Sequence, residues 1–207
     1  MDSSLFIFKL SKLMEQLSQN VTVIRYPDPM IMDNKGAIKI LLAGSASVGQ
    51  NDAYDWQNKF IQGLIQLADP TPGSKTGIMM FSKLNYIVID PRTNASNPAI
   101  SLDNPEFVQG FSYFLDMVDV ADAIFLNFLK RSTAPTGIFD LGYLIRSGKT
   151  VVRCPEEYFQ SGFVNFLCQR YNVPLLPGRQ GTVLSVLQSM FAFCQNIQQQ
   201  QQYQLPE

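Results

Sequence analysis

Residues 124–154 read IFLNFLKRSTAPTGIFDLGYLIRSGKTVVRC, and their pattern predicts a strand, a helix and a second strand. Ile124–Leu129 is apolar except for one asparagine, and Thr150–Cys154 is a second, mostly apolar run. Short apolar runs of this kind are typical of strands in a parallel sheet, where both faces are covered. We therefore expect this stretch to form one right-handed βαβ unit.

The helix between the two runs carries an acidic residue near its beginning. Thr136 can cap the helix, Gly148 can end it, and Asp140 lies about one turn inside it. Ligands of open α/β sheets bind beyond the carboxyl ends of the strands, so Asp140 is placed where a site is expected. The alternative is an acid that only stabilises the helix N-terminus, and the neighbouring residues alone favour that alternative.

The same alternation of strands and helices extends over most of the chain. It is typical of a parallel sheet with helices on both faces, a three-layer sandwich. Five core strands fit a flavodoxin-like (Rossmann-like) α/β order better than a full dinucleotide-binding fold. The expected core strands cover 38–44, 86–89, 124–129, 150–154 and 173–176, and the other expected helices cover about 54–67, 105–119, 160–171 and 182–194.

Length and composition suit one domain with an extension at each end. The chain has 207 residues, of which 46% are hydrophobic, enough for one substantial core. Residues 1–37 form an N-terminal extension with a helical pattern at 5–17 and a short strand pattern at 21–25. The domain covers 38–194. The Gln-rich tail, 195–207, is expected to be flexible or a weakly helical continuation of the last helix.

Charge and hydropathy disfavour two classes of partner. The formal net charge is −1, so no global basic field indicates nucleic-acid binding. The chain has no apolar run of about 18 residues, and Leu5–Leu10 is too short and too poorly flanked for a signal peptide. We therefore expect a soluble, cytoplasmic protein without a membrane partner.

The chain contains no histidine, and this removes whole classes of mechanism. No Ser-His-Asp or Cys-His nucleophile and no HExxH zinc site can be built. The three cysteines are widely spaced, so neither a disulfide framework nor a metal site is indicated, and we expect no cofactor. Acid–base or covalent chemistry must fall to carboxylates, Tyr, Lys or Cys.

Small and aromatic residues follow the first core strand. Backbone amides at Gly44 and Ser45 can bind a phosphate or a sugar hydroxyl, although a tight turn explains the same residues. The segment lacks the GxGxxG of dinucleotide folds and the Gly-Lys-Ser of P-loops, which disfavours NAD and ATP. Asp55 and Trp56 come next, and Trp56 either walls a base pocket or packs in the core.

Further polar residues lie at or near the same edge. Asp90 and Arg92 end the second core strand, where they either contact a ligand or pair with each other. Gln109 and Asp116 are seven residues apart on the next helix and therefore share a face. This face either contacts a ligand or is simply exposed to solvent. Asn127 interrupts an apolar strand, and a buried asparagine is either a structural bridge or a ligand contact.

These motifs, in their order and spacing, resemble the nucleoside 2-deoxyribosyltransferase-like family. The resemblance covers about residues 38–171. The segments that carry it are LLAGS at 41–45, DWQ at 55–57, DPR at 90–92, NPEFVQ at 104–109, ADAIFL at 121–126, APTGIFDLG with SGKTVVRCP within 134–155, and more faintly GFVNFLCQRY at 162–171.

The resemblance implies a flavodoxin-like fold and chemistry at the N-glycosidic bond of a nucleoside or nucleotide. In the family, the glutamate of an E-L-G motif attacks the anomeric carbon, and the matching residue here is Asp140, in D-L-G. The helix N-terminus would hold this carboxylate ionised. Asp90, Asp116 and Asp55 are the candidates that protonate the leaving base. The expected substrate-binding residues are Gly44, Ser45, Asp55, Trp56, Arg92, Gln109, Asn127 and Thr136.

The departure from glutamate leaves several functions open. Asp140 is one methylene shorter, and Ala134 stands where the family's transferases tend to carry another acid. One hypothesis is a deoxyribosyltransferase or N-glycoside hydrolase, and the other is a protein that binds a nucleotide without turnover. An architectural subunit with an empty site is a third. Because relatives complete their active sites with a neighbouring subunit, the resemblance also implies a homo-oligomer, with apolar surface expected from Phe111, Tyr113 and Phe114 or from Phe163 and Phe166.

Overall fold

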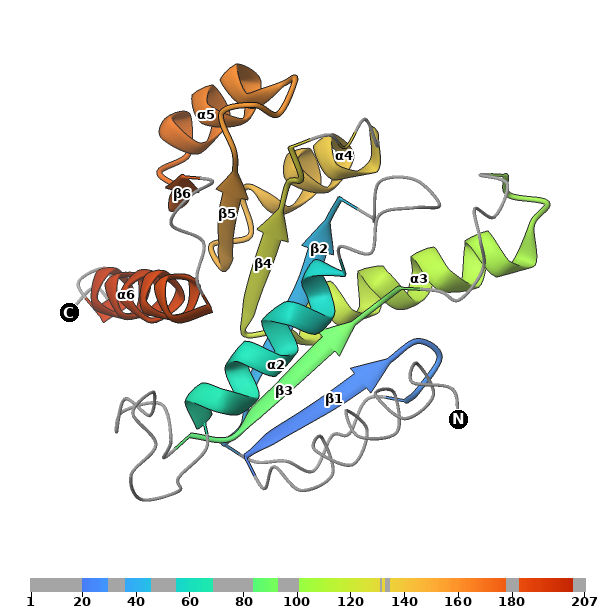
Figure 1. The fold of residues 1–207 in the computed structure, drawn as a ribbon, viewed down its shortest axis with the longest axis horizontal. Coiled ribbons are helices and arrows are strands. Elements are labelled where there is room, and N and C mark those ends of the chain that lie inside the picture. The colour runs from blue at the N-terminus through green and yellow to red at the C-terminus, as the bar shows by residue number, and fades with distance from the viewer. Residues whose placement is uncertain are drawn as a thin grey trace, which may run out of the picture. The chain divides into compact units, whose positions relative to one another are not determined.

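The structure, a computed structural model, consists of alternating strands and helices (Figure 1). It describes residues 20–29, 36–45, 55–68, 84–92, 101–130, 132, 135–177 and 183–202. The strands are β1 (Val21–Arg25), β2 (Ile38–Gly44), β3 (Tyr86–Asp90), β4 (Ala123–Asn127), β5 (Thr150–Cys154) and β6 (Leu175–Pro177). The helices are α2 (Trp56–Ala68), α3 (Pro105–Val120), α4 (Pro135–Leu144), α5 (Ser161–Arg170) and α6 (Val183–Gln202).

The strands form a six-stranded sheet in the order β1-β3-β2-β4-β5-β6. The pairs β1–β3, β2–β3, β4–β5 and β5–β6 are parallel. From β2 onwards, this order is that of a flavodoxin-like sheet, in which the chain adds strands first on one side of β2 and then on the other. The fold predicted from the sequence is confirmed, and its topological switch point lies between β2 and β4.

The predicted number of strands was wrong by one, because β1 had been assigned to an extension. In the structure, β1 runs parallel to β3, with Val21 opposite Tyr86 and Arg25 opposite Asp90. β1 lies at one edge of the sheet, and its middle and last residues are only partly buried, as expected for an edge strand. Its last residue, Arg25, is therefore brought to the carboxyl end of β3.

The chain divides into two compact units, and each has its own core. The first unit comprises residues 1–41 and 57–121, and every residue of β3 is buried in it. The second unit comprises residues 42–56 and 122–207, and all five residues of β4 are buried in it. Strands buried throughout are typical of parallel sheets with helices on both faces, which explains their continuous apolar runs.

Helix starts in the structure follow local capping chemistry. Asn104 caps α3, since its side-chain oxygen accepts the N–H of Glu106 at 3.1 Å, and Pro105 fills the first helical position. α4 likewise begins at a proline, Pro135. Thr136 is thus the second helical residue and not the cap, so that detail of the sequence analysis was wrong.

Two other predicted boundaries were also wrong. β4 ends at Asn127 and not at Leu129, so Asn127 is its last residue and does not interrupt it. α4 ends at Leu144, four residues before Gly148, whose φ of 72° belongs to the turn that precedes β5. An apolar pattern cannot separate a strand from the buried loop residues that follow it.

At the C-terminus, helical structure continues into the Gln-rich segment, because α6 extends to Gln202. The structure therefore agrees with a helical continuation up to that residue. The predicted N-terminal helix at 5–17 lies outside the described residues.

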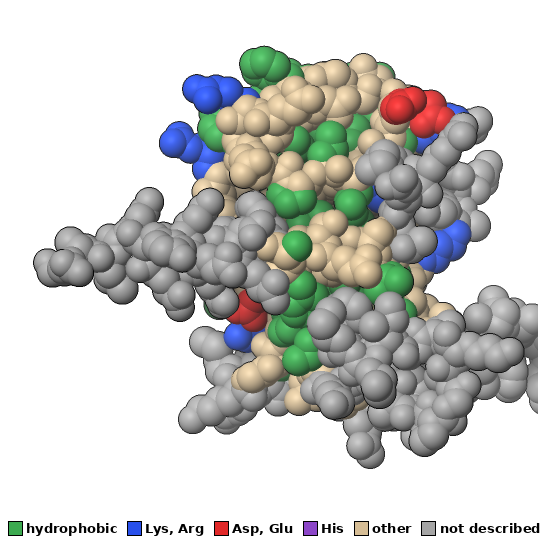
Figure 2. All heavy atoms as spheres, turned by 90° about the vertical axis from the view of Figure 1, so that its left-hand side faces the viewer, with side chains coloured by type: hydrophobic (Ala, Val, Ile, Leu, Met, Phe, Trp, Pro, Cys, Tyr) green, Lys and Arg blue, Asp and Glu red, His purple; other side chains and the backbone are tan. Residues whose placement is uncertain are grey.

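Several large apolar side chains are exposed in the second unit. On α5, Phe163 and Phe166 are 52% and 63% exposed, and Phe159 just before this helix is 62% exposed. Hydrophobic side chains are visible at the top of Figure 2, the level at which α5 lies in Figure 1. In the first unit, Phe114 is buried, and Phe111 and Tyr113 are only partly exposed.

Candidate active site

The carboxyl end of β2 requires a glycine. Gly44 has a φ of 109°, which side chains rarely adopt, and a Cβ added there would lie 2.8 Å from the backbone nitrogen of Asn127. The main chain of β2 can therefore approach the end of β4 only because Gly44 has no side chain. This contact lies at the switch point, where flavodoxin-like sheets bind their ligands.

Ser45 fixes the turn that follows Gly44. Its N–H donates to the carbonyl of Asn127 at 2.9 Å, and its hydroxyl accepts the N–H of Leu129 at 3.2 Å. Its own carbonyl accepts the indole N–H of Trp56 at 2.8 Å. Ser45 is 1% exposed, so its side chain supports the turn. The tight-turn interpretation of this segment agrees with these contacts.

Trp56 packs in the core at the start of α2. It is 4% exposed, and its ring meets Phe125 of β4 edge to face, with 5.6 Å between centroids. Its indole N–H is already used by Ser45. The core interpretation of Trp56 therefore fits better than a base-pocket wall. Asp55, one residue earlier, is partly exposed.

Asp140 lies on the part of α4 that packs against the end of the sheet. A Cβ added to Gly137, one turn earlier, would lie 3.1 Å from the ring of Phe128, so the glycine lets the helix come close. The Asp140 side chain is half-buried, and the backbone N–H of Gly44 hydrogen-bonds to its carboxyl group. The predicted acid and the glycine turn are thus brought together.

The electrostatic environment of Asp140 differs from the sequence-based expectation. Burial raises the pKa of its carboxyl group to about 7, and the Gly44 N–H lowers it only in part. The expectation that a helix N-terminus holds Asp140 fully ionised was therefore wrong. Desolvation of the charged form outweighs the Gly44 hydrogen bond, and Asp140 lies beyond the first turn of α4, where a helix dipole acts most strongly.

Asn127 pairs with a residue that the sequence analysis did not single out. Its side-chain oxygen accepts an N–H of Arg153 at 3.0 Å, and the two residues are opposite each other on β4 and β5. Asn127 is 1% exposed, which fits the structural-bridge interpretation. A charged residue at the end of the apolar run VVRC was the signal that could have identified Arg153.

The buried thiols of the second unit are poor nucleophiles. Burial raises the pKa of Cys154 to about 12 and that of Cys168 to about 11, so both thiols stay protonated near neutral pH. The side chain of Cys194 lies outside the described residues. In the same unit, burial raises the pKa of the Asp140 carboxyl group toward neutrality.

Asp90 and Arg92 belong to the first unit and pair with each other. The guanidinium of Arg92 donates to both carboxylate oxygens of Asp90, from Nε at 2.8 Å and from Nη2 at 2.6 Å. Asp90 is 1% exposed, and Arg25 of β1 places its Nε 3.9 Å from the same carboxylate. Of the two alternatives given for Asp90 and Arg92, the structure has the one in which they pair with each other.

The remaining predicted site residues are exposed. Gln109 and Asp116 lie on α3 in the first unit, on a solvated part of the helix, and Thr136 is exposed in the first turn of α4. The structure therefore brings together Gly44, Ser45, Trp56, Asn127 and Asp140, whereas Asp90, Arg92, Gln109 and Asp116 belong to the other unit.

Comparison with known proteins identifies the family. A family model described as nucleoside 2-deoxyribosyltransferase like matches residues 37–158, more than half of the chain. The chain belongs to this family. A comparison with curated proteins gave no significant match.

The first and last residues of the nucleoside 2-deoxyribosyltransferase-like match show which of these groups belong to the matched region. It includes the Gly44 turn, Asp140 and Arg153, and it ends at Tyr158, short of the fainter resemblance up to Tyr171. It begins after β1, so Arg25 lies outside it. Among the described residues, no helix is long and apolar enough to cross a membrane, and no group of three or more His, Cys, Asp or Glu side chains could hold a metal ion.

Proposed function

We propose that this member of the nucleoside 2-deoxyribosyltransferase-like family breaks the N-glycosidic bond of a nucleoside or nucleoside monophosphate, with Asp140 as the nucleophile. The observation that carries the proposal is the position of Asp140. It is a half-buried carboxyl group that contacts the Gly44 amide beside the switch point of the sheet. Family membership supports glycosyl chemistry as the class of reaction.

In the proposed reaction, a carboxylate oxygen of Asp140 forms a bond to the anomeric carbon while the carbon–nitrogen bond breaks. The base leaves with the electron pair of that bond and takes up a proton. A second base, or water, then gives up a proton to the group that protonated the leaving base and displaces the carboxylate, which yields the transferred or hydrolysed product with retained configuration. The amide of Gly44 orients the carboxylate throughout.

Asp55 is the strongest of the proposed proton donors to the leaving base. It belongs to the same unit as Asp140, and it is partly exposed. Asp116 is exposed on the other unit. Asp90 accepts hydrogen bonds from Arg92 on both oxygens, a role that suits an ionised acceptor, so we assign it to orienting Arg92.

For substrate binding, we propose that the backbone of the Gly44–Ser45 turn and the hydroxyl of Thr136 contact the sugar. Thr136 is exposed in the first turn of α4, one turn before Asp140. Arg92 and Gln109 belong to the other unit, so we assign them no contact with the sugar, and Asn127 is a weaker candidate because Arg153 engages its side chain.

A base-release assay tests the proposal. The full chain is incubated with a panel of deoxynucleosides and their 5′-monophosphates, and free base is measured by chromatography. We expect release by the wild type, at least about 100-fold less release by Asp140→Ala, and unchanged release by the exposed control Asp119→Asn. Equal release by wild type and Asp140→Ala would contradict the assignment.

A binding protein without turnover is the second candidate, and two observations favour it. Aspartate places its carboxyl group about 1 Å farther from the anomeric carbon than glutamate would, and displacements of that size cost about 100-fold in rate. In addition, the carboxyl group is only partly ionised near pH 7. Saturable binding of a nucleoside with no base released, by wild type and by Asp140→Glu alike, would establish this candidate.

A further inference from the structure

In the first unit, the buried carboxylate of Asp90 contacts two arginines, Arg25 and Arg92, at the carboxyl ends of β1 and β3. The Asp90 side chain is 2% exposed, whereas those of Arg25 and Arg92 are 37% and 33% exposed. Arg92 is held side-on by both oxygens of Asp90. Any solute that approaches this edge therefore meets the two guanidinium groups before the carboxylate.

Arg25 is fixed from two directions. Its Nε lies 3.9 Å from Asp90, and its Nη2 donates to the side-chain oxygen of Asn58 on α2 at 3.3 Å. The parallel register of β1 and β3 places Arg25 directly opposite Asp90. Both guanidinium planes are thus oriented before any ligand arrives, which reduces the entropy lost on binding.

The three side chains carry one positive charge in excess, because two guanidinium groups share a single carboxylate. Asp28 is a further acid near these groups, and it lies on the exposed turn after β1, where solvent screens its charge. The oxygens of Asp90 are committed to Arg92. The exposed parts of the two guanidinium groups can therefore donate hydrogen bonds to an anion at this edge.

Tyr113 supplies a second, independent indication of a ligand. Its hydroxyl oxygen is buried and has no hydrogen-bond partner among the described residues, although buried hydroxyls are normally paired. Burial, and then the charges of Asp28 and Asp90, raise the pKa of this phenol, so the hydroxyl keeps its proton and can donate it in a hydrogen bond.

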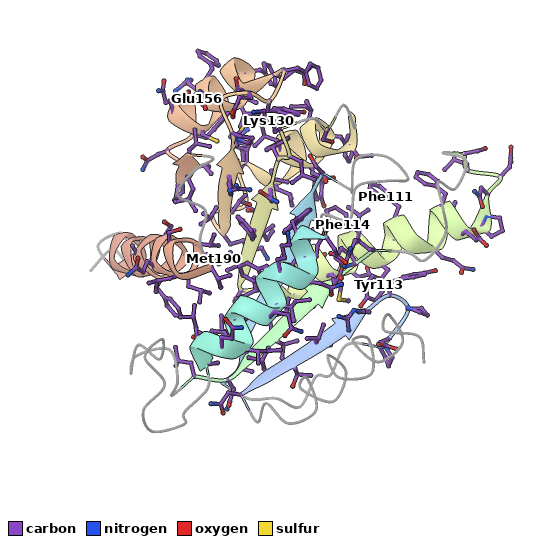
Figure 3. All side chains as sticks on the ribbon, in the orientation of Figure 1. Phe111, Tyr113, Phe114, Lys130, Glu156 and Met190 are labelled. Atoms are coloured by element: carbon purple, nitrogen blue, oxygen red, sulfur yellow. The ribbon has the colours of Figure 1, made fainter. Side chains whose placement is uncertain are left out.

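The phenol is also held in place. The rings of Tyr26 and Tyr113 meet edge to face with 5.3 Å between their centroids. Figure 3 shows Tyr113 on α3, close to the carboxyl end of β1. Its hydroxyl is therefore a fixed donor beside Asp90, among the same groups as the two arginines.

We propose that Arg25, Arg92 and Tyr113 form an anion site that takes the phosphate group of a monoester. Guanidinium forks match the geometry of phosphate oxygens, and a fixed phenol adds a third donor. Arg25 comes from β1, which precedes the family match, so this site is a feature of the chain beyond the matched region. It does not depend on Asp140, which belongs to the other unit.

Isothermal titration of the full chain with inorganic phosphate, in a phosphate-free buffer, tests the site. We expect saturable binding by the wild type. Arg25→Met should weaken it at least about tenfold and Tyr113→Phe about threefold or more, because each loses a hydrogen bond to a charged group. Arg170→Met, an exposed arginine on α5, is the matched control and should bind as the wild type does.

Tyr113→Phe keeps the proposal testable if Arg25→Met fails to fold, since the substitution removes only a hydroxyl that has no hydrogen-bond partner within the part of the chain that the structure describes. Absence of saturable binding by the wild type would overturn the site, as would equal phosphate affinity in the wild type and Tyr113→Phe. A second arm compares 2′-deoxyadenosine 5′-monophosphate with 2′-deoxyadenosine and with phosphate. If the monophosphate binds more tightly than both others, the phosphate group that the site binds is that of a nucleotide. If phosphate and the monophosphate bind equally, the ligand is free phosphate.

Discussion

Gly44 is the residue on which the geometry of the proposed active site depends most. Its positive φ and its contact with the backbone of Asn127 are both incompatible with a side chain. Gly44→Ala should therefore lower the free energy of unfolding by about 2–4 kcal/mol, measured by urea denaturation. Gly142→Ala is the control, because nothing lies within 4 Å of its added Cβ, and it should be neutral or stabilising. An equal loss in both variants would refute this account of Gly44.

Asp140 predicts a pH-dependent stability. Because burial raises its pKa from 3.8 to about 7, the folded protein keeps a proton that the unfolded chain releases between these values. Ionisation of the half-buried carboxyl group lowers the free energy of unfolding. This loss is absent below about pH 4 and nearly complete above about pH 7. Asp140→Asn should be more stable than the wild type by about 1–3 kcal/mol near pH 8, and the gain should vanish near pH 4.

Thermal denaturation across this pH range measures the difference, with the exposed Asp119→Asn as control. A constant difference between Asp140→Asn and wild type at every pH would contradict the raised pKa. The same ionisation predicts that base release rises with pH, with a midpoint near pH 7 and a plateau about one unit above it, because the proposed nucleophile must lose its proton.

The sequence predicted the position of Asp140 in the fold better than it predicted the ionisation of its side chain. Asp140 beside a glycine turn followed from the βαβ pattern and the resemblance. Its raised pKa did not, because desolvation depends on what covers the carboxyl group in three dimensions. Arg153 was missed because its partner, Asn127, lies on another strand.

Among the elements, α2 is anchored to the turn that follows β2. The indole of Trp56, its first residue, donates to the carbonyl of Ser45 and packs against Phe125. Trp56→Phe keeps an aromatic ring but loses this buried hydrogen bond, so the free energy of unfolding should fall by about 1–3 kcal/mol. Denaturation followed by circular dichroism measures it, and an unchanged stability would show that the bond is dispensable.

The limits of most elements were predictable, and the exceptions have physical reasons. The bounds of β2 and β5 agree with their apolar runs, whereas β4 ends early because Phe128 and Leu129 are buried without belonging to the strand. The membership of β1 in the sheet could not be predicted, since five residues with partial burial carry little periodic signal. That strand supplies Arg25, and therefore the proposed anion site.

For the whole molecule, the exposed aromatic side chains of α5 predict self-association. Phe163 and Phe166 are more than half exposed, which is costly in water unless another molecule covers them. We expect a homo-oligomer by light scattering at micromolar concentration. The double variant Phe163→Asp, Phe166→Asp should be monomeric, and Leu102→Asp, which is exposed in the other unit, should not change the mass. A monomeric wild type would contradict this prediction.

In the proposed reaction, Asp140 bonds covalently to the sugar. Mass spectrometry of the full chain, acid-quenched during turnover with a deoxynucleoside that releases its base, tests this bond. We predict a 2-deoxyribosyl adduct on the peptide that carries Asp140, and no adduct in Asp140→Ala. Base release without an adduct at this position, or an adduct on another residue, would contradict the claim.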